Sequence, residues 1–336
     1  MKPVTLSLDA MATRFEIVLY GDDAMRLRAA GEEALAEVEA LDRQLSLYRP
    51  ESDISWINAK AHRKPVKVEP RLFRLLRTAS ELSRATDGAF DITIAPLVRA
   101  WGLAGGEGRI PSEPEIAEAL ERVGMHRVHL DEADFTVQFE HDGMEIDLGA
   151  IGKGYAVERA IETLRDNGIA SALIHGGTST IYGLGSPPCA DSWRVAVTST
   201  LPSLPRRGRG WAAVASTLPS LPRRGRGRLG HSIQDCDRTT EIPKHHVVAL
   251  RDSSLSVSAV RGKSFTAAGT EYGHVIDPRT GRPSNRAALA AVWGPSAVES
   301  DALSTALLVL GEPGLTILGK GFADCRGLVI APEVGH

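Results

Sequence analysis

Two oxygen-bearing side chains four residues apart, Asp301 and Thr305, are the first candidates for chemistry in this sequence. On a helix, residues four positions apart lie one turn apart on the same face. A carboxylate and a hydroxyl placed in this way are hard oxygen ligands of the kind that Mg²⁺ takes together with water and phosphate. A structural explanation competes, because Asp in a first helical turn interacts favourably with the helix dipole and a helical Thr can bond to a backbone carbonyl. The spacing alone favours that structural explanation.

A glycine-rich segment around Lys153 is the second candidate. Residues 146–178 are predicted to form a strand, a glycine loop, a helix and a second strand. The free amides of a helix N-terminus, with Lys153 beside them, would suit an anion such as phosphate. The segment matches neither the P-loop nor the dinucleotide-binding fingerprint. Glycines in a tight strand-to-helix turn are often only structural, so both interpretations stay open.

His274 and Asp91 complete the candidates. His274 lies on a predicted strand, 272–276, directly before the tight turn that the sequence DPRTG (277–281) specifies. A strand histidine is often only structural, but beside a turn that carries an arginine it is a candidate base or phosphate contact. Asp91 lies on a predicted strand in which apolar and polar residues alternate from 91 to 94. Its carboxylate either projects into a cleft or is simply exposed, and the chemistry alone favours the exposed position.

Helices and strands that would position these candidates follow from hydrophobic periodicity and from cap and turn residues. The last predicted helix would begin with Ser300 as its cap and end at Gly311. The strands at 193–197 and 245–250 are expected to share one sheet. Helices are predicted over residues 22–45, 72–83, 113–122 and 299–311, and strands over 13–20, 193–197, 245–250, 253–260 and 288–293, with a hairpin over 127–139.

The composition is that of an ordinary globular protein. The chain has 336 residues, of which 43% are hydrophobic and 24% charged, with a formal net charge of −3. This balance excludes a general nucleic-acid binder. No apolar run reaches the roughly 18 residues of a membrane span, and no signal-peptide pattern opens the sequence, which predicts a cytoplasmic protein without a membrane span. The three cysteines have no zinc or disulfide spacing.

An internal repeat interrupts the second half of the chain. The twelve residues STLPSLPRRGRG occur at 199–210 and again at 216–227. The repeat has no aromatic residue and no alternating apolar face, which predicts a disordered surface insertion at about 199–228. The alternative is a phosphate or nucleic-acid patch, because seven arginines lie between Arg206 and Arg228.

Seven motifs in order connect these candidates. They are MAT at 11–13, LSLYRPESDIS at 45–55, TDGAFD at 86–91, DLGAIGKGYAV at 147–157, IHGG at 174–177, YGHVIDPRTGRP at 272–283 and SDALSTA at 300–306. This set resembles the ApbE family of FAD:protein FMN transferases. The resemblance implies a single α+β domain over 1–336, with mixed and largely antiparallel sheets flanked by helices and a flavin cleft between two intimate subdomains.

The resemblance also implies an activity and roles for individual residues. In that family, FMN passes from FAD to a Thr or Ser hydroxyl of a target flavoprotein, with Mg²⁺ bound and AMP released. His274 would help to deprotonate the acceptor hydroxyl. Two departures stand out: Thr178 replaces the usual Asp after the paired glycines, and the export leader of the often periplasmic family is missing. The resemblance assigns Met11, Tyr48, Asp91, Lys153 and Val275 to the FAD site, and Asp301, Thr305 and the carbonyl of Ala150 to the metal.

Two other functions stay open beside the transferase. Water could replace the acceptor hydroxyl, which would make the protein a Mg²⁺-dependent FAD pyrophosphatase that yields FMN and AMP. A flavin-binding protein without catalysis is the third possibility, and the presence of His274, Asp301 and Thr305 disfavours it. The partners expected for the transferase are FAD and a flavoprotein with a Thr or Ser acceptor motif, without nucleic acid.

Overall fold

A seven-stranded antiparallel sheet is the centre of the fold. The computed structural model describes residues 2–106, 108–197, 214–216, 246–260, 264–267 and 270–332. All strand pairs in this part of the chain are antiparallel, which confirms the predicted α+β class. In spatial order the central strands are β1 (Val4–Ala10), β2 (Thr13–Leu19), β6 (Ala172–Gly176), β7 (Thr180–Leu184), β11 (Ser253–Ala259), β16 (Leu289–Gly294) and β17 (Arg326–Ile330).

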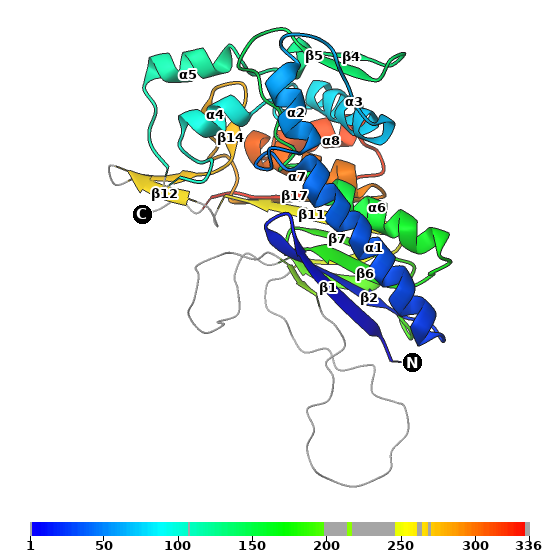
Figure 1. Cartoon of the computed structure of the whole chain (residues 1–336). Coiled ribbons are helices and arrows are strands. Elements are labelled where there is room, and N and C mark those ends of the chain that lie inside the picture. The colour runs from blue at the N-terminus through cyan, green and yellow to red at the C-terminus, as the bar shows by residue number, and fades with distance from the viewer. Residues whose placement is uncertain are drawn as a thin grey trace.

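Helices α1 (Ala24–Leu45), α6 (Gly152–Asp166) and α7 (Ala297–Leu310) cover one face of this sheet (Figure 1). Each buries an apolar stripe in the main core, as the periodicity of α1 predicts. Helix α7 is buried almost all round, because it lies between the sheet and the other helices. The short helix α8 (Gly314–Gly321) follows it. No helix in the described ranges is both long and apolar enough to cross a membrane.

A second, three-stranded sheet packs against the opposite face. Its order is β10 (His246–Leu250), β8 (Trp193–Val197) and β9 (Val214–Ser216). Trp193 and Leu250 are buried there against Leu255 of β11. The expectation that 193–197 and 245–250 share a sheet is therefore confirmed. The insertion predicted at about 199–228 lies outside the described residues except for β9.

Smaller elements surround one end of the central sheet. Trp101, buried between α4 and α5, is the largest side chain of their small core. The elements are α2 (Asp53–Lys60), β3 (Val66–Lys67), α3 (Pro70–Ala85), α4 (Ala95–Ala100), α5 (Glu113–Leu120), a 3₁₀ turn (Met125–Arg127), β4 (Val128–Asp131), β5 (Thr136–Phe139), β12 (Ser264–Ala267), β13 (Thr270–Gly273), β14 (Ile276–Asp277) and β15 (Arg282–Pro283).

Helix α5 begins with the capping box that its sequence predicts. The backbone amide and hydroxyl of Ser112 both donate to Oε2 of Glu115, at 2.7 and 2.9 Å. Arg109 donates to the other carboxylate oxygen at 2.7 Å. The hydrogen bonds from Arg109 and Ser112 together lower the pKa of Glu115 to about 2.

Two predicted strands are not strands, because side chains take some of their backbone hydrogen bonds. The amide and carbonyl of Ile146 bond to the side chain of Asn58, at 2.8 and 3.0 Å, so residues 146–148 run as an extended loop. At 91–94, Oδ1 of Asp91 accepts from the amide of Thr93 at 2.8 Å and turns the backbone. Pro96 then lies in the first turn of α4 instead of ending a strand.

Two other boundaries also differ from the prediction. His274 lies between β13 and β14, not on one continuous strand over 272–276. Helix α7 begins after Ser296, whose hydroxyl accepts from the amide of Glu299 at 3.2 Å, so Ser300 is not the cap. Ser300 is instead buried, with its hydroxyl 2.9 Å from that of Ser254. The end of α7 at Gly311 agrees with the prediction.

Candidate functional site

A cavity of about 740 Å³ lies where the N-terminal and C-terminal parts of the chain meet. Its volume is within the range of small-molecule sites, about 300 to 1,000 Å³. The β1–β2 turn, the loop after α1, the glycine loop before α6 and helix α7 all contribute to its wall. Every site residue that the sequence singled out lines this one cavity: Met11, Tyr48, Asp91, Ala150, Lys153, His274, Val275, Asp301 and Thr305.

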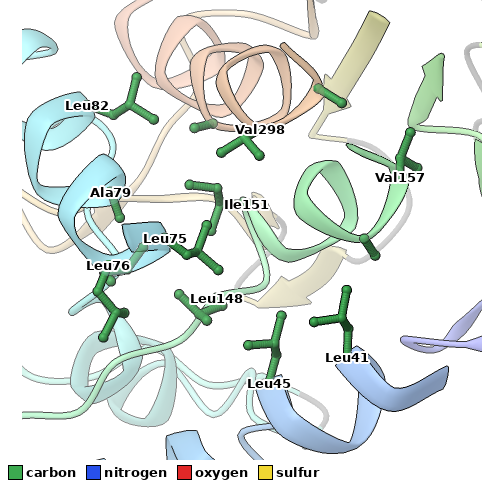
Figure 2. Packing of buried hydrophobic residues seen from close by; sticks show 14 of the residues in the cluster. Leu41, Leu45, Leu75, Leu76, Ala79, Leu82, Leu148, Ile151, Val157 and Val298 are labelled. Carbon is green, nitrogen blue, oxygen red and sulfur yellow. The ribbon is translucent and has the colours of Figure 1, made fainter. Parts of the chain in front are cut away.

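The glycine loop is held in place by its own apolar side chains. Leu148 and Ile151 are both buried in the main core. Figure 2 shows them packed among side chains of α1, α3 and α7. The residues between them, Gly149 and Ala150, stay at the cavity wall. The two buried residues thus anchor both ends of a short loop before α6, and this loop has no regular secondary structure.

Asp301 is a buried carboxylate in the cavity wall, with 3% of its surface exposed. Its Oδ2 accepts from the amide of Gly154 at 2.9 Å, and its Oδ1 accepts from the hydroxyls of Thr180 at 3.2 Å and Ser256 at 3.0 Å. All three donors are uncharged. An ionised carboxylate has about four lone-pair sites, so one remains for a further partner. A buried negative charge with only neutral donors is stabilised by a cation at that position.

The bond from Gly154 to Asp301 changes the interpretation of the glycine loop. The sequence predicts an anion at the N-terminus of α6. For the amide of Gly154, this anion is the carboxylate of Asp301 on α7 and not a ligand phosphate. The two helices approach so closely that a Cβ on Gly154 would lie 2.2 Å from the carbonyl oxygen of Ala297. Lys153 stays at the cavity wall, with its Nζ 3.3 Å from the carbonyl oxygen of Gly149.

A second contact fixes α6 to α7. Oε2 of Glu158, one turn after Gly154, accepts from the amide of Ala297 at 2.7 Å and from the hydroxyl of Ser296 at 2.8 Å. A carboxylate at this position satisfies the free amides at the start of α7. The contacts at Gly154 and Glu158 together fix the position of Asp301 relative to the glycine loop.

The oxygen atoms that could hold a metal come from two segments, helix α7 with Asp301 and Thr305 and the turn before α6 with Ala150. Thr305 Oγ1 lies 3.2 Å from Ser258 Oγ and 3.4 Å from the carbonyl oxygen of Asp301. Ala150 belongs to the turn before α6. In the described part of the chain no three His, Cys, Asp or Glu side chains gather into a metal-binding group. The donor set is therefore one carboxylate with neutral oxygens, which fits a hard cation such as Mg²⁺ that keeps waters and substrate oxygens.

Asp91 is buried, with 8% of its surface exposed, so the expectation of an exposed residue is wrong. Besides the amide of Thr93, its carboxylate accepts from the hydroxyl of Thr93 at 2.6 Å and from the amide of Met125 at 2.9 Å. Ser83 adds a longer bond of 3.3 Å. Asp91 thus lines the cavity while it holds the loop at 91–94 to the neighbouring segments.

His274 and Val275 lie directly before a turn, 277–281, that is held at both ends. The carboxylate of Asp277 accepts two hydrogen bonds from the guanidinium of Arg279, at 2.8 and 2.7 Å, and these bonds raise the pKa of Arg279. At the end of the same turn, the indole nitrogen of Trp101 donates to the carbonyl of Gly281 at 2.7 Å. The predicted DPRTG turn is therefore present, although His274 does not lie on a strand.

The N-terminal wall contains a turn with an unusual backbone. Met11 and Ala12 have φ angles of 51° and 56°, in the left-handed region that non-glycine residues rarely adopt. Oδ1 of Asp42 accepts from the amide of Met11 at 2.7 Å and holds this turn. Tyr48 stands at the rim, with 72% of its surface exposed.

Two acidic residues at the cavity were not among the sequence candidates. Asp42 is one of several acids on α1, and nothing in its sequence context distinguishes it. Asp147 opens the segment DLGAIGKG, so its place in that motif was a signal that could have found it. Thr178, which stands where the resemblance leads us to expect Asp, also lines the cavity.

Comparison with known proteins identifies relatives of the whole chain. The chain is 29% identical over 316 residues to the FAD:protein FMN transferase of Treponema pallidum (strain Nichols), a match that covers 92% of this chain and 79% of the relative. The apo form of Pseudomonas stutzeri flavinyl transferase ApbE superposes with a TM-score of 0.76 and 26% identity, over 99% of this chain and 92% of the other.

The fold alone is shared with a more distant structure. The ApbE protein of Thermotoga maritima gives a TM-score of 0.77 at 23% identity, over 98% of this chain and 94% of the other. The sequence model of the ApbE family matches residues 11–220 and 227–325. The gap between the two matched ranges falls inside the second copy of the repeat. By its sequence over most of its length and by its fold, the chain belongs to the ApbE family.

Proposed function

We propose that the protein is an FAD:protein FMN transferase, which moves FMN from FAD to a Thr or Ser hydroxyl of a target flavoprotein and releases AMP. The observation that carries this proposal is the convergence of all the predicted site residues on one cavity, although they come from segments as distant as Met11 and Thr305. The names of the relatives in Treponema pallidum and Pseudomonas stutzeri support the same activity.

The cavity has the charges that this reaction requires. The pyrophosphate of FAD carries two negative charges, and phosphoryl transfer depends mainly on positioning and on electrostatic stabilisation. Lys153 supplies a positive charge at the cavity wall. Asp301, Thr305 and the carbonyl of Ala150 would hold Mg²⁺, which would neutralise charge on the phosphates as a Lewis acid. The contacts of Gly154 and Glu158 with α7 keep Asp301 in position.

We assign to His274 the role of the base that accepts the proton of the acceptor hydroxyl. In the transfer step the acceptor oxygen forms a bond to the phosphorus of the FMN phosphate, and the bond between that phosphorus and the AMP oxygen breaks. The acceptor proton passes to the imidazole, which is in the cavity wall. The turn at 277–281 follows His274 closely in the chain, and Arg279 and Trp101 restrain this turn through Asp277 and Gly281.

Mass spectrometry of an acceptor peptide tests the proposal. The full chain is incubated with FAD, Mg²⁺ and a peptide that contains one Thr, and a peptide with Ala at that position is the control. We expect the Thr peptide to gain the mass of FMN less water, with one AMP released per transfer. AMP and free FMN without modified peptide would show a pyrophosphatase instead. FAD binding without AMP release would reduce the protein to a flavin carrier.

A further inference from the structure

Three serines on β11 face helix α7 in a regular row. Ser254, Ser256 and Ser258 alternate along the strand, so their side chains point to the same face of the sheet. Ser254 Oγ lies 2.9 Å from Ser300 Oγ, at the start of α7. Ser256 donates to Asp301 at 3.0 Å. Ser258, the last serine of the row, lines the cavity. Its hydroxyl lies within hydrogen-bonding distance of the hydroxyls of Ser304 and Thr305 on α7.

The protons of the Ser304, Ser258 and Thr305 hydroxyls can be assigned so that each hydroxyl donates one hydrogen bond. Ser304 donates to the carbonyl of Asp301 at 2.9 Å, so its oxygen is free to accept. Ser258 lies 2.8 Å from Ser304 and can give its single proton there. The oxygen of Ser258 then accepts the proton of Thr305, across 3.2 Å. The other acceptor near Thr305, the carbonyl of Asp301, is farther away at 3.4 Å and already accepts from Ser304.

This assignment matters because a hydroxyl binds a cation through its lone pairs and keeps its proton. When the proton of Thr305 points to Ser258, the lone pairs of Thr305 can face the cavity. A neighbour that orients a metal ligand in this way contributes to affinity without touching the metal. We propose that Ser258 is a positioning residue of the cation site, which orients the hydroxyl of Thr305 toward the cation. The inference rests on the proposed function, because that function places a cation at Asp301 and Thr305.

Cation binding to the full chain tests the inference directly. Mn²⁺, which takes oxygen ligands like Mg²⁺, is titrated with and without FAD and followed by the paramagnetic resonance signal of the free ion. We expect Ser258→Ala to weaken binding about 10-fold, at the low end of the effect of residues that orient metal ligands. Ser258→Thr keeps the hydroxyl and should restore the affinity. Ser254→Ala, which removes the hydroxyl at the far end of the same row, should leave it unchanged.

A double-mutant cycle separates orientation from a general loss of structure. If Ser258 acts only through Thr305, the weakening by Ser258→Ala should disappear when Thr305 is already replaced by Val. Parent-like binding by Ser258→Ala, or the same weakening in both backgrounds, would overturn the inference. The proposed metal site has its own control, because Asp301→Ala should abolish binding. Unchanged Mn²⁺ binding in Asp301→Ala would refute the metal site itself, whatever the result for Ser258.

Discussion

Replacement of Gly154 by Ala tests how the fold builds the candidate metal site. An added Cβ would lie 2.2 Å from the carbonyl oxygen of Ala297 and 2.8 Å from Cβ of Asp301. Since non-bonded contacts of this kind need more than 3 Å, helices α6 and α7 would have to separate by about 1 Å. Overpacking of this size costs about 1 to 3 kcal/mol of unfolding free energy.

The same movement would break the bond between the two helices. The Gly154 amide is 2.9 Å from Oδ2 of Asp301, and a separation of about 1 Å takes it out of hydrogen-bonding range. A buried amide without a partner costs about 1 to 3 kcal/mol more. Gly154→Ala should therefore lose about 2 to 6 kcal/mol of stability and weaken Mn²⁺ binding, because Asp301 moves with α7.

Gly152 is the matched control in the same first turn of α6. A Cβ there meets only Cβ of Leu148, at 3.9 Å, which is an ordinary contact. Gly152→Ala should be neutral or stabilising by up to about 1 kcal/mol, because Ala is the better helix former. The assay is urea unfolding followed by circular dichroism, together with the Mn²⁺ titration. Equal unfolding free energies for Gly154→Ala and Gly152→Ala would refute the close-approach argument.

Three further substitutions have expected outcomes. Asp301→Ala should abolish AMP formation at ordinary Mg²⁺ concentrations while FAD binding, read from flavin fluorescence, weakens much less; surviving activity would show that the metal site is wrong. His274→Asn should keep FAD binding but lose about 10² to 10⁴-fold in transfer rate, the usual cost of removing a general base; unchanged transfer would remove His274 from the mechanism. Glu115→Gln should destabilise the protein at pH 7. Because folding lowers the pKa of Glu115 from 4.5 to about 2, its contribution is complete above pH 4.5 and disappears as the pH falls through 2. Urea unfolding of parent and variant between pH 7 and 2 measures this, and a difference that does not change with pH would contradict it.

Local patterns in the sequence were sufficient for most of the regular structure. The periodicity of α1 and the capping box of α5 each report on neighbouring residues only, and both are present in the structure. The hairpin of β4 and β5 was also predicted from alternation and a turn. The order of the motifs identified the ApbE resemblance, which the family match confirms. These features depend on short stretches of chain, so a single sequence contains the information for them.

Some of the predictions that failed were wrong because of contacts between distant segments. Residues 146–148 have the composition of a strand, but the side chain of Asn58, 88 positions away, takes the backbone bonds of Ile146. His274 lies between two short strands, and the turn that follows them is bonded to Trp101, 180 positions from Gly281. No local pattern contains such information, because the partner of each group is chosen by packing.

The candidate site also combines features that the sequence determines with features that only the tertiary structure determines. The residue types and the i, i+4 spacing of Asp301 and Thr305 follow from the sequence alone, and so does the charge of Lys153. Only the tertiary structure decides that the N-terminus of α6 meets Asp301 through Gly154, and that this bond leaves a lone pair of the carboxylate for a cation. The physical reason is that a buried amide and a buried carboxylate must each find a partner, and the fold brings together residues 147 positions apart to satisfy both.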